Sequence, residues 1–196
     1  MILFGFDPGG LNNFGWACLS IGKSGIPVSL NTGCSSNAPD AITEASHHAS
    51  GKAPAAVGID APLFWIAKGD RLADAGIRTR VCAAGGTSGN VGNVNSLRGA
   101  CLVQGVLAAR QIAETWPSAQ ITEAHPKALL LLHLEASQFL ADNLLAPHLE
   151  HERDAALAAY AAWAFAVRLT GWVDLVIKER APYFPSGHSV SYWFPS

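Results

Sequence analysis

Three acidic residues lie at the carboxyl ends of apolar segments that are typical of β-strands. Asp7 ends ILFGFD, Asp60 ends PAAVGID, and Glu123 lies near the end of AQITEAHP, each with a proline within the next three residues. A fourth acid, Asp154, lies in the first turns of an alanine-rich segment that is predicted to be helical. Because open α/β sheets bind ligands at the carboxyl ends of their strands, we expect these acids to converge there.

Clustered carboxylates repel one another, and a divalent cation is the usual partner that stabilises them. Oxygen ligands suit Mg²⁺ or Mn²⁺ better than zinc, and the sequence has no Cys-x-x-Cys pair. We therefore predict Asp7, Asp60 and Asp154 as metal ligands, with Glu123 completing the catalytic set by joining the shell or orienting water. Such a site suits phosphoryl-transfer chemistry, in which one or two metal ions act on a phosphate.

Each acid also has a purely structural interpretation. An aspartate before Pro-Gly is common in turns, which covers Asp7, and Asp60 before Ala-Pro can simply end a strand. Glu123 can pair with an arginine, and Asp154 can complement a helix dipole. His151, one turn before Asp154, is either a helper of the site or an ordinary histidine at a helix end. The joint pattern of acids favours the functional interpretation.

A change of composition between residues 66 and 98 predicts an insertion over the site. Its first part is rich in charge, and we assign Arg71, Arg78 and Arg80 to phosphate binding, although a solvated helix face explains any one of them equally well. Its second part, 85–96, is rich in Gly and Asn and is expected to be a mobile loop.

The elements that must position these residues follow from the apolar pattern. Strands are expected over 2–7, 14–21, 26–34, 54–60 and 119–126, the first three as an antiparallel meander. Helices are expected over 40–50, 99–116, 127–145 and 147–169. Asp40 is the predicted cap of the first helix, and Pro147 lies near the first turn of the last.

The composition limits the class of protein. A chain of 196 residues with 49% hydrophobic and 14% charged residues suits one globular domain, 1–196. A formal net charge of -2 argues against a broad, nonspecific nucleic-acid-binding surface but leaves room for a local basic groove. No apolar run reaches the roughly 20 residues that span a bilayer, so no membrane partner is expected. Four scattered cysteines, with no basic leader, predict a reduced cytoplasmic protein.

Taken in order, GFDPGGLNNFGWA, VGIDAPLFW, DRLADAGIRTR, TEAHPKA and HERDAALAA resemble a family catalogued as domain of unknown function 429. The likeness runs over about residues 2 to 169. Its members are predicted nucleases of the ribonuclease-H-like fold. The resemblance implies a mixed five-stranded sheet, three strands antiparallel and then two parallel, with helices on both faces.

The resemblance also implies roles for single residues. Asp7 matches the metal-bridging acid of the first strand, and Asp60 matches the acid that ends the fourth. Asp154 with His151 is similar to the His-x-x-Asp of Holliday-junction resolvases, and Glu123 matches an E-x-x-P signature on the fifth strand. The implied function is a Mg²⁺- or Mn²⁺-dependent nuclease that hydrolyses phosphodiesters by a two-metal-ion mechanism. Its partner would be nucleic acid, DNA or RNA.

Two other functions fit the same pattern. Sugar kinases and actin-like ATPases open with an acid and paired glycines, much like FDPGGLNN, and cradle phosphate there through backbone N–H groups. They need a second such domain, which this chain supplies only as a homodimer. The other alternative is a non-catalytic module of the same fold that binds nucleic acid. The sequence leaves the oligomeric state open.

Overall fold

A five-stranded sheet forms the centre of the molecule. The computed structural model describes residues 1–10, 12–64, 66, 70–92, 99–144 and 149–196. The strands of the central sheet are β1 (Ile2–Asp7), β2 (Phe14–Ile21), β3 (Pro27–Ser35), β4 (Ala56–Ile59) and β5 (Gln120–Glu123). Their positions agree with the five predicted strands.

The strand order is β3-β2-β1-β4-β5. The first three strands pair antiparallel as a meander, whereas β4 and β5 run parallel to β1. The predicted α/β architecture, a mixed five-stranded sheet with three antiparallel and two parallel strands, is therefore confirmed. In this topology β1 and β4 are neighbours at the centre, so their carboxyl ends lie side by side.

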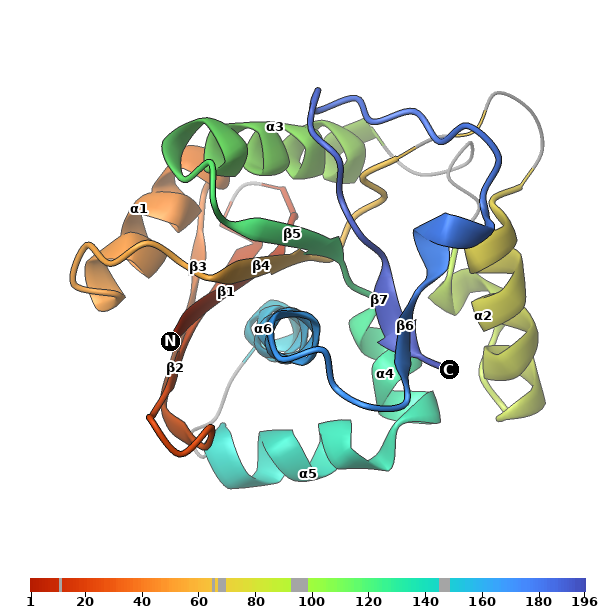
Figure 1. The fold of residues 1–196 in the computed structure, drawn as a ribbon, viewed down its shortest axis with the longest axis horizontal. Helices are drawn as coiled ribbons and strands as arrows, with labels where there is room; N and C mark the ends of the chain where they lie inside the picture. The colour runs from red at the N-terminus through yellow and green to blue at the C-terminus, as the bar shows by residue number, and fades with distance from the viewer. Residues whose placement is uncertain (11, 65, 67–69, 93–98, 145–148) are drawn as a thin grey trace.

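Helices cover both faces of the sheet (Figure 1). One face carries α1 (Ala38–His48) and α3 (Gly99–Thr115), and the other carries α6 (Glu150–Ala166), with α5 (Leu134–Asn143) beyond it. Within the described ranges, the remaining helices are α2 (Leu72–Ala83), α4 (Pro126–Leu132) and the short 3-10 helices η1 (Ser88–Asn90) and η3 (Leu175–Lys178). In the part of the chain that is described, no helix has the length and hydropathy needed to cross a bilayer.

Glycines let α6 lie directly on the sheet. A Cβ added to Gly5 would lie 2.0 Å from the carbonyl oxygen of Ala155, and one added to Gly58 would lie 2.0 Å from that of Ala158. On β2, a Cβ at Gly15 would lie 2.2 Å from the His151 oxygen. The three glycines come from adjacent strands, so the helix crosses the sheet with its backbone against theirs, and its alanines keep that approach close.

The structure differs from the predicted elements at several ends. The segment 127–145 forms two helices instead of one, because His133 leaves the helical region with φ -137° and ψ 100°. Asn37, instead of Asp40, caps α1, and its side chain accepts the Asp40 backbone N–H. A two-stranded sheet of β6 (Trp172–Asp174) and β7 (Trp193–Pro195) lies at the C-terminal end of the chain. Pro147 is outside the described residues.

Candidate functional site

Asp7 and Asp60 lie next to each other at the centre of the sheet. The last pair of the β1–β4 ladder is Phe6 with Ile59, and the Asp60 backbone N–H donates to the Phe6 oxygen at 2.8 Å. The pairing thus continues one residue past β4. Asp7 follows Gly5 by two residues and Asp60 follows Gly58 by two, so both side chains lie on the face that α6 covers.

The helix α6 brings two more predicted residues to this edge. Asp154 is buried, with 2% of its surface exposed, and Arg153 donates two hydrogen bonds to its Oδ1 at 2.8 and 2.6 Å. The Nδ1 atom of His151 lies 2.5 Å from Oδ2 of Asp7, so the histidine contacts the acid of the first strand directly. His151 is therefore part of this site and not merely a residue at a helix end.

The three carboxylates share one electrostatic environment. Burial raises the pKa of Asp60 to about 8, and the charges of Asp7 and Asp154 add to that rise against the opposing effects of His125 and Lys127. Burial also raises the pKa of Asp7, partly offset by its bond with His151 and increased by Asp154. Each acid therefore carries its charge at a cost that the nearby side chains only partly relieve.

The present side-chain positions do not bring these three acids into a tight cluster. Among the described residues, the set of potential ligand atoms that all lie within 4.8 Å of one another comes from Asp74, Glu123 and His125. The trio of Asp7, Asp60 and Asp154 is not such a set. Asp7 is directed to His151 and Asp154 to Arg153.

Glu123 belongs to a different row of the sheet. In the parallel register it is level with Ile59 and Phe6, which alternate with Gly58 and Gly5 and thus point away from α6. The predicted catalytic set is therefore divided by the sheet. Asp7, Asp60 and Asp154 lie on one side and Glu123 on the other.

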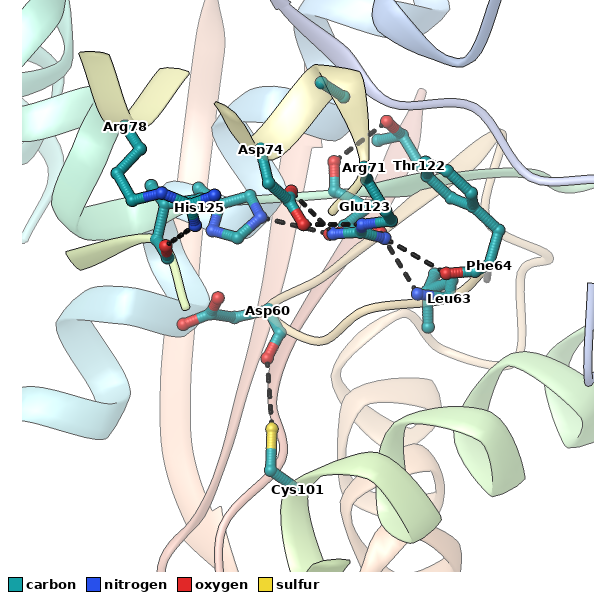
Figure 2. Close-up of polar contacts among 12 residues, drawn as sticks. Asp60, Leu63, Phe64, Arg71, Asp74, Arg78, Cys101, Thr122, Glu123 and His125 are labelled. Atoms are coloured by element: carbon teal, nitrogen blue, oxygen red, sulfur yellow. Dashed lines mark hydrogen bonds and ion pairs between the residues drawn. The ribbon is translucent and has the colours of Figure 1, made fainter. Parts of the chain in front are cut away.

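The carboxylate of Glu123 is buried and fully engaged. Its Oε1 accepts from Arg71 Nη2 at 2.7 Å and contacts His125 Nε2 at 3.0 Å, and its Oε2 accepts from Arg71 Nη1 at 2.9 Å and from the Leu63 N–H at 3.0 Å. Figure 2 shows these bonds converging on the one carboxylate. Burial alone would raise the pKa of Glu123, but Arg71 and His125 outweigh it and hold the pKa at about 2.

Arg71 is the centre of this second cluster, which we call the buried ion network (Arg71, Asp74, Glu123 and His125). Its Nε and Nη2 donate to Asp74 at 2.6 and 2.7 Å, and its guanidinium carbon lies 4.3 Å from the centre of the Phe64 ring. None of Arg71 is exposed to solvent. We predicted that Arg71 lies over the site and binds phosphate. It is buried inside the protein instead, where it cannot contact a phosphate.

The buried ion network needs no metal ion. The carboxylates of Asp74 and Glu123 have the spacing of metal ligands, but the guanidinium of Arg71 already donates hydrogen bonds to all four of their oxygens. The structural interpretation of Glu123, pairing with an arginine, is the one that the contacts support. Sequence analysis did not identify Asp74 and His125 as its partners.

Arg78 and Arg80 are also held by the protein. Arg78 donates to the Val91 oxygen at 2.6 Å and pairs with Asp70, while Arg80 donates to the Pro195 oxygen at 2.7 Å. Arg80 lines a cavity to which none of the three site acids contributes. The predicted insertion 66–98 is described only in part, because residues 67–69 and 93–98 lie outside the described residues. The missing residues include the end of the Gly/Asn-rich stretch 85–96.

Lys127 is a residue of the site that sequence analysis missed. It lies in the first turn of α4, directly after β5, and its positive charge lowers the pKa values of Asp7, Asp60 and Asp154 alike. Its Nζ lies 2.9 Å from Oε1 of Glu150, with 51% of its side chain exposed. The sequence feature that could have revealed Lys127 is its position in HPKA, four residues after Glu123, the acid that ends β5.

The Pro-Gly-Gly turn after Asp7 has a local explanation. A Cβ at Gly9 would lie 2.0 Å from the Asn13 oxygen, and the Asn13 N–H donates to the Gly10 oxygen at 2.9 Å. The chain thus folds back on itself at Gly9, which only glycine permits. This turn accounts for Gly9 without a bound phosphate.

Comparisons of the chain with protein-family models, with curated proteins and with solved structures found no match. The family resemblance drawn from the sequence motifs therefore stays a prediction, and the function must be argued from the site itself.

Proposed function

We propose that this protein is a divalent-metal-dependent phosphodiester hydrolase of the ribonuclease-H-like fold, acting on nucleic acid. The observation that carries the proposal is the pairing of Asp7 and Asp60 at adjacent strand ends, beneath a helix that supplies Asp154 and His151. The strand order supports the fold assignment, since it is the mixed five-stranded arrangement that the family resemblance implies.

The donor chemistry of the three acids fits a divalent cation. Asp7, Asp60 and Asp154 offer only hard carboxylate oxygens, which suit Mg²⁺ or Mn²⁺. Burial, and to a smaller extent the charges of neighbouring acids, raise the pKa values of Asp7 and Asp60, and a cation between them would offset that cost. Binding requires Asp7 and Asp154 to turn from His151 and Arg153 toward Asp60. When bound, the cation would act as a Lewis acid on a phosphoryl oxygen.

Other side chains have roles that follow from their charge and position. Lys127 is half-exposed beside the acids, so its ammonium group can contact a substrate phosphate once it leaves Glu150. His151 orients Asp7 through Nδ1. Arg153 offsets the charge of Asp154 until a cation replaces it. Glu123 contributes indirectly, because the buried ion network fixes the end of β5 from which α4 and Lys127 extend.

The direct experiment separates metal binding from cleavage. Manganese binding is measured by calorimetry and by electron paramagnetic resonance on wild type and on Asp7→Asn, Asp60→Asn and Asp154→Asn. Cleavage is then measured on single-stranded, duplex, hybrid and branched nucleic acids. We expect each variant to lose most manganese affinity and at least about a hundredfold in rate, since each removes one of three ligands.

Asp142→Asn is the matched control, because it makes the same chemical change at an exposed aspartate on α5, away from the three acids of the proposed site. It should bind manganese and cleave like wild type. Manganese binding without cleavage of any substrate would support a non-catalytic module instead. Manganese affinity that is equal in wild type and Asp60→Asn would refute the proposed site.

A further inference from the structure

The cavity that Arg80 lines is separate from the acids and lies between α5, α6 and the chain that leads into β6. Its volume is about 680 Å³, within the range of small-molecule sites. Figure 1 shows α5 crossing α6 on the side away from the sheet. None of Asp7, Asp60 and Asp154 lines this cavity, so it is separate from the proposed hydrolytic site.

Aromatic rings make up much of the cavity wall. Phe139, Tyr160 and Trp163 follow one another with ring centres 4.9 and 5.4 Å apart and planes tilted by 35° and 32°. Trp172 lies edge-on to Tyr160, with centres 5.9 Å apart. His133 is bonded to the Tyr160 hydroxyl at 2.9 Å. The cavity therefore presents a group of electron-rich rings from the helices α5 and α6 and the strand β6.

The charged groups at the rim are mainly acidic. Glu135 and Asp142 lie seven residues apart on α5, on the same helix face as Phe139, and both are exposed. Asp142 accepts from the Gln138 amide, and the contact of Glu135 is with His133, whose pKa is lowered by burial, which favours the neutral ring. Arg80, a cation that also lines the cavity, already donates to the Pro195 oxygen.

From this combination we infer that the cavity binds a small organic cation, with an ammonium group held against the aromatic rings and the acidic rim. Cations bind aromatic faces through the ring quadrupole, and the two carboxylates attract positive charge to the mouth. A nucleotide or another anion is disfavoured, because its phosphates would meet Glu135 and Asp142. This binding site does not depend on the proposed nuclease activity.

The test uses choline and benzyltrimethylammonium as probes and the neutral carbon isostere of choline as the matched comparison. Binding is measured by calorimetry and by the change in tryptophan fluorescence, since Trp163 and Trp172 both line the cavity. We expect the cations to bind at least about tenfold more tightly than the neutral isostere, the difference that one charge against aromatic rings and carboxylates provides.

Two variants locate the binding. Trp163→Ala should weaken cation binding about tenfold, and the double variant Glu135→Gln with Asp142→Asn about threefold. The double variant changes only exposed side chains, so its fold is retained even if Trp163→Ala is unstable. Glu114→Gln, an exposed acid on α3, should bind like wild type. Asp60→Asn should also bind normally, whatever its effect on cleavage. Equal affinity for the cation and its neutral isostere, or no binding of either, would overturn the inference.

Discussion

Replacing Arg71 with methionine tests whether the buried ion network is structural. The change removes a guanidinium that makes five hydrogen bonds to Asp74, Glu123 and the Phe64 carbonyl, while keeping an apolar side chain of similar length. It leaves two buried carboxylates without their cation. Breaking a buried pair in this way costs about 3–5 kcal/mol, a large share of the roughly 5–15 kcal/mol that stabilises a typical domain.

The loss is measured by urea unfolding at neutral pH and by thermal melting. At about 2–4 °C per kcal/mol for a chain of this length, we expect the melting temperature to fall by about 6–20 °C. The stability difference between wild type and Arg71→Met should shrink toward pH 4. In the variant, Asp74 and Glu123 can then be protonated, and they no longer need a positively charged partner. Arg71→Met combined with Glu123→Gln should lose less than the sum of the single variants, because the two residues act as one unit.

Arg110→Met is the control, since Arg110 also pairs with a glutamate, Glu114, but on the open surface of α3. It should leave the unfolding curve unchanged. A loss below about 1 kcal/mol for Arg71→Met, the level of an exposed ion pair, would show that Arg71 does not hold the fold together.

Four other predictions follow from the same contacts. The lowered pKa of Glu123 contributes stability that is present above pH 4.5 and lost as the pH falls toward 2, so urea unfolding of Glu123→Gln should lack this acid-sensitive part. The raised pKa of Asp60 makes the folded state bind a proton between pH 3.8 and about 8, so stability without divalent metal should fall as the pH rises through that window. Asp60→Asn should remove this pH dependence and have a higher melting temperature than wild type at pH 8. Gly58→Ala should destabilise the fold by at least about 1–3 kcal/mol through the clash with α6, whereas Gly76→Ala, in open space on α2, should stabilise it by about 0.5–1 kcal/mol in the same melting assay. Nitrogen NMR of the imidazole should find the proton of His125 on Nε2, because Glu123 can only accept there, and an unprotonated Nε2 would contradict the bond.

The strands were predictable because their signal is local. Apolar runs broken by Gly, Pro and Asn located all five strands of the central sheet, and the antiparallel meander followed from the short connections between the first three. The break at His133 was not predictable, since KALLLLHLEASQFLADNLL has helical spacing throughout. Tertiary packing of α4 and α5 overrides that preference.

The site was predicted in part for a related reason. The predicted strand ends placed Asp7 and Asp60 together at the carboxyl ends of the strands. The face that each side chain occupies depends on the register between strands, which cannot be deduced from any single segment. Glu123 was therefore grouped with acids on the opposite face. Its pairing with Arg71 joins residues 52 positions apart, a contact that composition and spacing cannot reveal.

The glycine contacts beneath α6 have a consequence for how this protein can change over time. Because Gly5, Gly15 and Gly58 accept the helix backbone itself, α6 has one permitted rotation about its axis. Inserting or deleting a single residue between Asp154 and Ala158 would turn the preceding part of the helix by about 100° relative to the sheet, carrying Asp154 away from the strand ends. We therefore expect natural variants to tolerate changes of length in the surrounding loops but not within this stretch.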